Sequence, residues 1–161
     1  MFVDNLTKAL LENTSRMNQP KELLQFYKAE SKMVLSLPLV EAISAGFPSP
    51  AADYIDIAID INKELIKNPS STFYGKVKGY SMIDLGIGEG DIMVVDKSLE
   101  PATGDIAVCF IDGEFTLKQI LIRKREVLLM PANADFEPIK VTEDNEFLIW
   151  GIVTYTIKKR R

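Results

Sequence analysis

The sequence contains no histidine and only one cysteine among its 161 residues. Without histidine, a Ser-His-Asp triad is impossible, and with a single cysteine a zinc site is not expected either. Cys109 lies within an apolar, strand-like run, where it has no partner for an internal disulfide and is expected to be a small core residue. We therefore predict no metal ion and no cofactor.

The chain also lacks any apolar run near the ~18 residues that a membrane span requires, and it has no signal-peptide pattern. Its net charge is −4 and its pI is about 5.0, which argues against general electrostatic binding of nucleic acid. The basic tail 158–161 is interpreted as a solvated terminus, with phosphate contact as the alternative. Apolar residues make up 47% and charged residues 26%, as is typical of a globular protein. We expect a cytoplasmic protein that binds neither a membrane nor a specific DNA sequence.

Residues 1–32 are rich in polar side chains and are predicted to form two short helices, the second of which Pro20 opens. Two such helices also permit a helix-turn-helix interpretation. However, residues 1–44 carry five basic and five acidic side chains, too few and too balanced for a DNA reader. The prolines within 45–52 resist helix, so this segment is either a linker or an extended substrate for a protease cleft.

A short helix is predicted over 55–68, with Asp60 as its N-cap. The pattern after that is β, with turn residues between short apolar runs. Gly-Asp-Ile occurs at 90–92 and again at 104–106, and each copy opens an apolar run. These features predict one small antiparallel, barrel-like sheet. The expected strands are 73–79, 91–96, 105–111, 114–122, 126–130 and 147–157.

Ser81 follows the first of these strands and precedes a loop that contains three glycines. A serine on such a bend is exposed, and neighbouring backbone N–H groups are free to bind an oxyanion. Its hydroxyl needs a base, and in the absence of histidine the usual base is a lysine whose pKa is lowered by burial. Lys118 is the candidate.

The pair Asp112-Gly113, between two apolar runs, is the strongest hairpin signal in the chain. A two-residue turn there brings Lys118 beside Ala107 and near Cys109, which is a low-dielectric environment for an amine. The alternative is an ordinary strand lysine whose stem reaches out to water. The predicted pairs are Ile111 with Glu114, Phe110 with Phe115, Cys109 with Thr116, and Ala107 with Lys118.

Three segments, in this order, resemble those of a known family. The segment 45–54 looks like the cleavage-site segment of the UmuD branch of the LexA/UmuD family of self-cleaving Ser-Lys proteins. Residues 79–91, Gly-Tyr-Ser-Met-Ile-Asp followed by Gly86-Ile87 and Gly90-Asp91, resemble the family's serine region, and 104–118 is similar to its lysine region. The resemblance covers about 37–155. It implies a mainly β fold, a compact antiparallel barrel-like domain of β-clip type with an N-terminal arm containing short helices.

The resemblance also implies a peptidase S24-like serine endopeptidase that cuts its own chain. It assigns the nucleophile to Ser81, the base to Lys118 and the cleaved bond to Ala45–Gly46. From the chemistry of the residues themselves, we assign the oxyanion hole to the main-chain N–H group of Ser81 and to that of Met82 as a second donor. Residues 1–45 are then an arm that cleavage removes, with 1–32 a helical extension of unknown role or the product of a start codon assigned upstream. Residues 46–72 are a linker with a short helix, and 73–161 are the β-rich domain.

Partners follow from the same resemblance. It implies a homodimer, cleavage stimulated by the RecA–single-stranded DNA filament in the SOS response, and a shortened form that serves as regulatory subunit of a UmuC-type, error-prone translesion polymerase. The alternatives are a LexA-like self-cleaving repressor and an accessory subunit that binds but never cuts. A signal peptidase shares a Ser-Met motif and a lysine base, but it needs a membrane anchor that the sequence does not predict.

Overall fold

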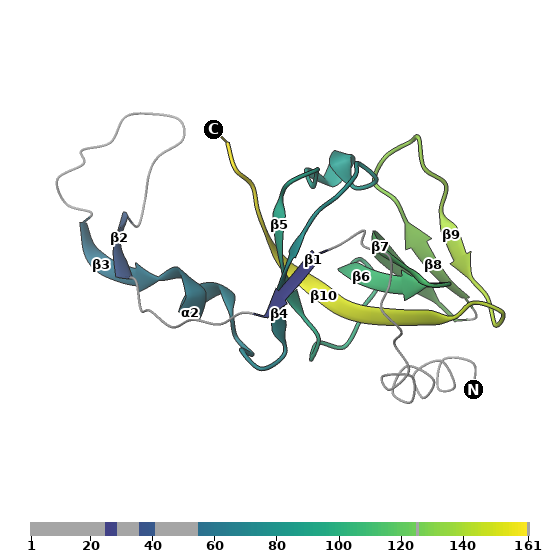
Figure 1. Cartoon of the computed structure of the whole chain (residues 1–161), viewed down its shortest axis with the longest axis horizontal. Helices are drawn as coiled ribbons and strands as arrows, with labels where there is room; N and C mark the ends of the chain where they lie inside the picture. Colours follow the sequence, from purple (N-terminus) through teal and green to yellow (C-terminus); the bar gives the residue numbers. More distant parts are fainter. Residues whose placement is uncertain (1–24, 29–35, 41–54, 125, 161) are drawn as a thin grey trace.

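The structure, a computed structural model, describes residues 25–28, 36–40, 55–124 and 126–160. Its strands are β1 (Gln25–Lys28), β2 (Ser36–Val40), β3 (Ile55–Asp60), β4 (Thr72–Lys76), β5 (Ile92–Asp96), β6 (Ile106–Ile111), β7 (Glu114–Arg123), β8 (Glu126–Met130), β9 (Ile139–Val141) and β10 (Phe147–Ile157). Eight of them form one sheet in the order β1-β4-β5-β10-β6-β7-β8-β9, while β2 and β3 form a separate pair (Figure 1).

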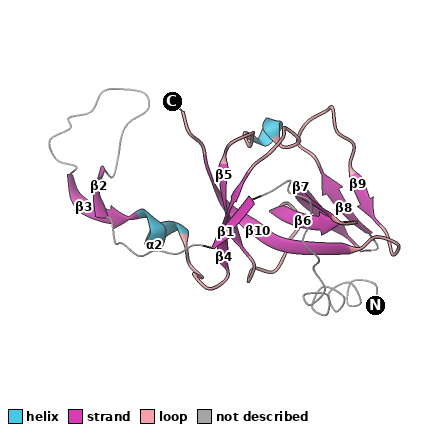
Figure 2. Ribbon diagram, viewed as in Figure 1, coloured by secondary structure: helices cyan, strands magenta, loops and turns pink. Residues whose placement is uncertain are grey.

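The mainly β, antiparallel fold is confirmed. Every ladder in the large sheet is antiparallel, and all six strands predicted between 73 and 157 are present within a few residues of their expected ends. Figure 2 shows that strands and loops make up most of the described chain. Among the described residues no ladder joins the edge strands β1 and β9, so the sheet is open rather than closed into a barrel.

The helix predicted over 55–68 is wrong in its first half. Residues Ile55–Asp60 form β3, and α2 covers only Ile61–Leu65. Isoleucines 55, 57 and 59 alternate with smaller or acidic residues, and this period of two is typical of a strand. Asp60 does cap the helix as predicted, because its Oδ1 accepts the N–H of Asn62 at 3.0 Å. No helix in the described part of the chain is long and apolar enough to cross a membrane.

The second predicted helix of the N-terminal extension is also wrong where the structure describes it. Residues Gln25–Lys28 form β1, which pairs with β4 so that Tyr27 lies opposite Tyr74. At 25–28, a free sheet edge with unpaired backbone groups thus overrides the helical pattern that the sequence shows over 21–27. The rest of 1–32 lies outside the described residues. Strand β9, only three residues long, was not predicted.

Both faces of β6 are buried, so the sheet lies between two hydrophobic cores. Val108 points to one core and Ala107 and Cys109 to the other, because successive side chains of a strand alternate between its faces. The first core consists of Val77, Met82, Ile87, Met93, Val95, Val108, Phe115, Leu117 and Trp150. The second consists of Ala107, Cys109, Ile111, Ile120, Val127, Leu129, Val141 and Ile152. Side chains of β7 therefore pack into both cores, Phe115 and Leu117 into the first and Ile120 into the second.

The hairpin between β6 and β7 has the predicted turn and register. Asp112 has φ 49° and Gly113 has φ 91°, the positive values that a type I′ turn requires. All four predicted pairs are present, from Ile111 with Glu114 at the turn to Ala107 with Lys118. The turn residues therefore fix the position of Lys118 on the sheet.

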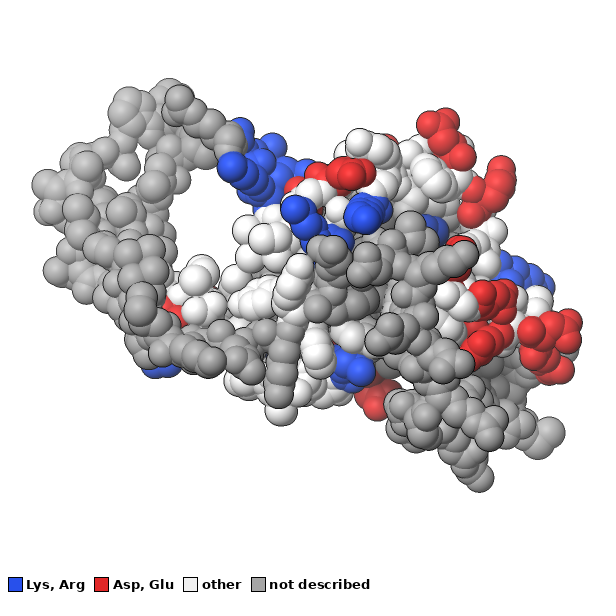
Figure 3. All heavy atoms as spheres, viewed as in Figure 1, with Lys and Arg blue, Asp and Glu red and all other residues white. Residues whose placement is uncertain are grey.

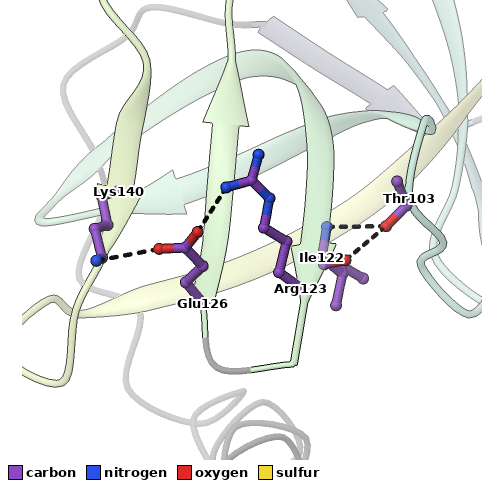
Figure 4. A network of polar contacts seen from close by, with 5 residues as sticks. All are labelled: Thr103, Ile122, Arg123, Glu126 and Lys140. Atoms are coloured by element: carbon purple, nitrogen blue, oxygen red, sulfur yellow. Dashed lines mark hydrogen bonds and ion pairs between the residues drawn. The ribbon is translucent and has the colours of Figure 1, made fainter.

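Polar contacts on both sides hold the other end of β7, as Figure 4 shows. Glu126 on β8 accepts from Arg123 at 2.9 Å and from Lys140 on β9 at 3.1 Å. On the other side, the Thr103 hydroxyl accepts the N–H of Ile122 at 2.9 Å and donates to the carbonyl of Ile122 at 3.1 Å. These contacts join β7, which carries Lys118, to the strands and loop around it.

Charged side chains of both signs are spread over the face shown in Figure 3, with one concentration of each sign. Basic side chains gather near the C-terminal tail and acidic ones at the end of β8 and β9. Lys158, the first lysine of the tail, forms an ion pair of 2.9 Å with the buried carboxylate of Asp91. Burial alone would raise the pKa of Asp91, but the N–H of Gly88 and the Lys158 ammonium lower it below its ordinary value. The start of the tail is therefore fixed to the sheet.

Candidate active site

Ser81 lies on a loop that is closed at its base by backbone hydrogen bonds. The N–H of Val77 donates to the carbonyl of Asp91 at 2.9 Å, and the N–H of Gly90 donates to that of Val77 at 3.0 Å. Between them, Met82 is buried in the first core with 2% of its surface exposed, while Ser81 is half-buried. The buried Met82 anchors the loop, so the preceding serine is held at the surface of the sheet.

The structure brings Lys118 and Ser81 together, 37 residues apart in sequence. The Nζ of Lys118 lies 2.9 Å from the Oγ of Ser81, and the lysine is 6% exposed. Two further groups contact Nζ: the hydroxyl of Thr116 at 2.9 Å and the carbonyl of Leu117 at 3.0 Å. The lysine does not extend into water, so the alternative of an ordinary strand lysine is wrong.

The three contacts of Nζ suit a neutral amine as well as an ammonium ion. An ammonium has three N–H donors, one for each oxygen. A neutral amine has two, and the carbonyl of Leu117 must take one because it can only accept. If Thr116 takes the other, the lone pair faces Oγ of Ser81 and can accept its proton.

Burial favours the neutral form of Lys118. It lowers the pKa of Lys118 below its ordinary value, and only the nearby thiol of Cys109 acts in the other direction. Cys109 itself is completely buried, and burial raises the pKa of its thiol to about 12. Near neutral pH the thiol is therefore protonated, so it places no negative charge beside the lysine.

The two side chains face a pocket of about 200 Å³. Its walls are the serine loop, the first half of β7 and one aromatic side chain from the loop after β8. The lining residues are Val77, Lys78, Gly79, Tyr80, Ser81, Met82, Ile87, Phe115, Thr116, Leu117, Lys118 and Phe136. A larger groove of about 700 Å³ lies over β1, β4 and the end of β10, and its described lining residues include lysines and tyrosines but neither serine nor threonine. A candidate nucleophile, Ser81, and a candidate base, Lys118, therefore lie together in the smaller pocket.

Two backbone N–H groups at the serine have no hydrogen-bond acceptor in the described structure. Within the described residues, neither the N–H of Ser81 nor that of Met82 donates a hydrogen bond. Both residues line the pocket. These are the N–H groups that the sequence assigns to an oxyanion hole, and they are available for one.

The expected cleavage site, Ala45–Gly46, lies outside the described residues. In the chain it falls between β2 and β3, which pair with each other antiparallel from Ser36 with Asp60 to Val40 with Ile55. Figure 1 shows this pair to one side of the large sheet, joined to β4 through α2. Segment 41–54 therefore connects the two strands of a hairpin.

Comparison with known proteins agrees with this geometry. The pattern of the Peptidase S24-like family matches residues 38–154, which run from the last three residues of β2 through every later strand to most of β10. The chain belongs to the Peptidase S24-like family. It therefore belongs to a family of serine peptidases and self-cleaving proteins, and the family resemblance stated from the sequence is confirmed.

Three relatives of this S24-like chain illustrate the range of similarity. It is 41% identical to protein MucA of Salmonella typhimurium over 134 residues, which cover 82% of this chain and 91% of the relative. It is 41% identical to protein SamA of the same species over 121 residues, 75% of this chain and 84% of the relative. It is 38% identical to the LexA repressor of Alcanivorax borkumensis over 122 residues, 76% of this chain but 59% of the repressor.

Sequence reasoning missed three residues of the S24-like site. Thr116 lies two residues before Lys118 on the same face of β7, so the strand period was the available signal. Phe136 and Asn133 come from the loop after β8. Phe136 lines the pocket, and the side-chain N–H of Asn133 donates to the carbonyl of Tyr80 at 3.0 Å. Nothing local in the sequence indicates that this loop reaches the serine.

Proposed function

We propose that this protein cuts its own chain between Ala45 and Gly46, with Ser81 as nucleophile and Lys118 as general base. The observation that carries the proposal is the 2.9 Å contact between Nζ of a buried lysine and Oγ of a serine at the edge of a pocket. Membership of the Peptidase S24-like family supports it, because peptidases of this class need an activated nucleophile and this chain has no histidine.

The proposed reaction proceeds in two steps. The amine of Lys118 accepts the proton of Ser81 as Oγ attacks the carbonyl carbon of Ala45. The N–H groups of Ser81 and Met82 stabilise the oxyanion of the tetrahedral intermediate. The resulting ammonium then donates its proton to the nitrogen of Gly46, which leaves, and an ester joins Ser81 to Ala45. Water, deprotonated by Lys118, hydrolyses that ester and regenerates the serine.

The pocket is suited to a tethered substrate. Ala45 has a small side chain and Gly46 has none, so a pocket of about 200 Å³ accommodates them without a deep subsite. Attachment to the same polypeptide, or to a second protomer, supplies a high effective concentration of the cleavage segment. The site therefore has no need to bind foreign peptides well, which restricts its specificity.

We further propose the cellular role that the family resemblance implies. The protein forms a homodimer, the RecA–single-stranded DNA filament stimulates its cleavage after DNA damage, and residues 46–161 act as regulatory subunit of a UmuC-type translesion polymerase. Similarity to MucA and SamA over most of their length supports this role.

The test is incubation of the pure protein at alkaline pH, followed by denaturing gels and intact mass. Fragments 1–45 and 46–161 are expected from the wild type, and none from Ser81→Ala or Lys118→Ala. Ser70→Ala and Lys124→Ala, which change exposed residues away from the pocket, serve as matched controls and should cut normally. A wild type that stays intact even with an activated RecA filament would refute self-cleavage and favour a subunit that only binds.

A self-cleaving repressor is the second candidate, favoured by the similarity to a LexA repressor. The chain spans 59% of that repressor's length, so a large part of it has no counterpart in the matched region. A gel-shift assay with the intact protein separates the two roles. Tight binding to one DNA sequence, lost on cleavage, would establish the repressor role instead.

A further inference from the structure

The loop between β8 and β9 contacts the serine loop at three points. The N–H of Ala132 donates to the carbonyl of Ser81 at 2.8 Å, and the carbonyl of Ala132 accepts the N–H of Asp84 at 2.8 Å. The side-chain N–H of Asn133 donates to the carbonyl of Tyr80 at 3.0 Å. The loop therefore holds the carbonyl groups on both sides of the serine.

The orientation of the Asn133 amide follows from its partners. Its Oδ1 accepts the backbone N–H of Asp135 at 2.9 Å, so this atom must be the oxygen. Its Nδ2 faces a carbonyl, which can only accept, so this atom must be the donor. The first contact shapes the loop itself and the second reaches the serine loop. The two functions of the side chain are therefore carried by different atoms.

Peptide geometry links these contacts to the N–H groups beside the pocket. A trans peptide unit is planar, and its N–H points away from its C=O. No peptide bond is cis in the part of the chain that the structure describes. When the carbonyls of Tyr80 and Ser81 are bound from one side, the N–H groups of Ser81 and Met82 must point to the other. These two N–H groups have no acceptor in the described structure.

We propose that Ala132 and Asn133 are positioning residues that orient the oxyanion hole. Each holds the carbonyl end of one peptide unit, and the opposite end of that unit is one of the two proposed oxyanion donors. Asn133 fixes the N–H of Ser81 together with the N–H of Ile83, which also donates to the carbonyl of Tyr80 at 3.2 Å, and Ala132 fixes that of Met82. This inference rests on the proposed self-cleavage, since it assigns those N–H groups to that reaction.

The same loop also supplies part of the pocket wall. Phe136 lines the pocket, and its N–H donates to the carbonyl of Asn133 at 3.2 Å. Loss of the contact to Tyr80 would therefore affect both the donors and the nearby wall. Asn133 does not contact Lys118, whose partners are Ser81, Thr116 and Leu117. A defect caused by Asn133 should accordingly leave the titration of the lysine unchanged.

Two substitutions separate the positioning role from a structural one. Asn133→Asp keeps an oxygen for the N–H of Asp135 but has no donor for Tyr80, whereas Asn133→Ala loses both contacts. If Asn133 only shapes its own loop, the aspartate variant should cut like the wild type. If it holds Tyr80, both variants should be slow. Asn145→Ala is the matched control, because Asn145 also bridges two exposed loops, through Asp112, far along the chain from Ser81.

The experiment measures the self-cleavage rate of the full chain from pH 7 to 11, with thermal melting of each variant. We expect both Asn133 variants to cut up to about 100-fold more slowly at the high-pH plateau, because a misplacement of about 1 Å costs roughly that much and complete loss of an oxyanion donor costs about 100- to 1,000-fold. For Asn133→Ala the midpoint of the pH profile should not move, and Asn145→Ala should match the wild type. A wild-type rate for Asn133→Asp would overturn this inference but leave the proposed function standing. A wild type that never cuts would overturn both.

Discussion

Replacement of Thr116 by valine should move the pH dependence of self-cleavage toward lower pH. The hydroxyl of Thr116 accepts from Nζ of Lys118 at 2.9 Å, and valine has nearly the same shape without the oxygen. A hydrogen bond with a charged group contributes about 1.5–3 kcal/mol and one between neutral groups about 0.5–1.5 kcal/mol. Loss of the acceptor therefore destabilises the ammonium more than the amine, by about 1 kcal/mol.

That difference changes the ratio of amine to ammonium roughly five-fold in favour of the amine. Because burial already lowers the pKa of Lys118, the substitution acts in the same direction. Below the midpoint of the profile the fraction of neutral amine limits the rate. There the cleavage rate of the variant, expressed as a fraction of its own plateau rate, should be higher than that of the wild type. The plateau itself should fall, since Thr116 also helps to hold Nζ beside Ser81.

The assay follows fragment 46–161 on denaturing gels at half-unit steps of pH for the wild type, Thr116→Val and Thr116→Ser. Thr116→Ser keeps the hydroxyl, so its midpoint should match that of the wild type. The reasoning would be refuted by a valine profile that moves toward higher pH, or by one that coincides with the wild type in both midpoint and plateau.

Three further outcomes are expected. Lys118→Met should stabilise the fold against urea at pH 7, because burial penalises the ammonium of Lys118 in the wild type. That penalty is complete below the lowered folded-state pKa and fades as the pH rises toward the pKa of the unfolded chain, so a stability gain that grew toward pH 10 would contradict the burial argument. Gly151→Ala should destabilise the fold by about 1–3 kcal/mol, because a Cβ there would lie 2.7 Å from Cγ1 of Val95 and 3.3 Å from the carbonyl of Asp96; an unchanged urea midpoint would mean that β10 moves aside. Cys109 should resist iodoacetamide at pH 8 until the protein is denatured, given complete burial and a thiol pKa of about 12, and rapid labelling of the native protein would count against both.

Local signals in the sequence were sufficient for the part of the site on the hairpin. Asp112-Gly113 allows one tight turn, and a strand period of two then determines that Lys118 faces Ala107. Elimination identified the pair of side chains that the structure brings together: with no histidine present, a lysine in an apolar environment was the remaining candidate base for Ser81. Both arguments use only local sequence or composition, so they can be made from a single sequence without information on contacts between distant residues.

Other features depended on contacts that the sequence does not encode locally. The residues of β1 carry a helical pattern, and they form a strand because the edge of β4 offers backbone partners. The contact between Asn133 and Tyr80 spans 53 residues and joins two irregular loops, so neither periodicity nor turn chemistry predicts it. The strand at 55–60 was different, because its alternation was visible in the sequence, and the cap at Asp60 correctly marked a helix that begins only after it.

The two N-terminal strands give the proposed cut an unusual consequence. A break between 45 and 46 would leave β1 and β2 on one fragment and their partners, β4 and β3, on the other. Four residue pairs of the first ladder and five of the second would still join the pieces. Hydrolysis of the peptide bond and dissociation of the two fragments would then be separate events with separate rates. Between them, a cleaved protein whose fragments are still associated would exist. Native mass spectrometry would detect this species as an uncut mass plus one water, and two free fragments from the first time point would show that the ladders do not delay separation.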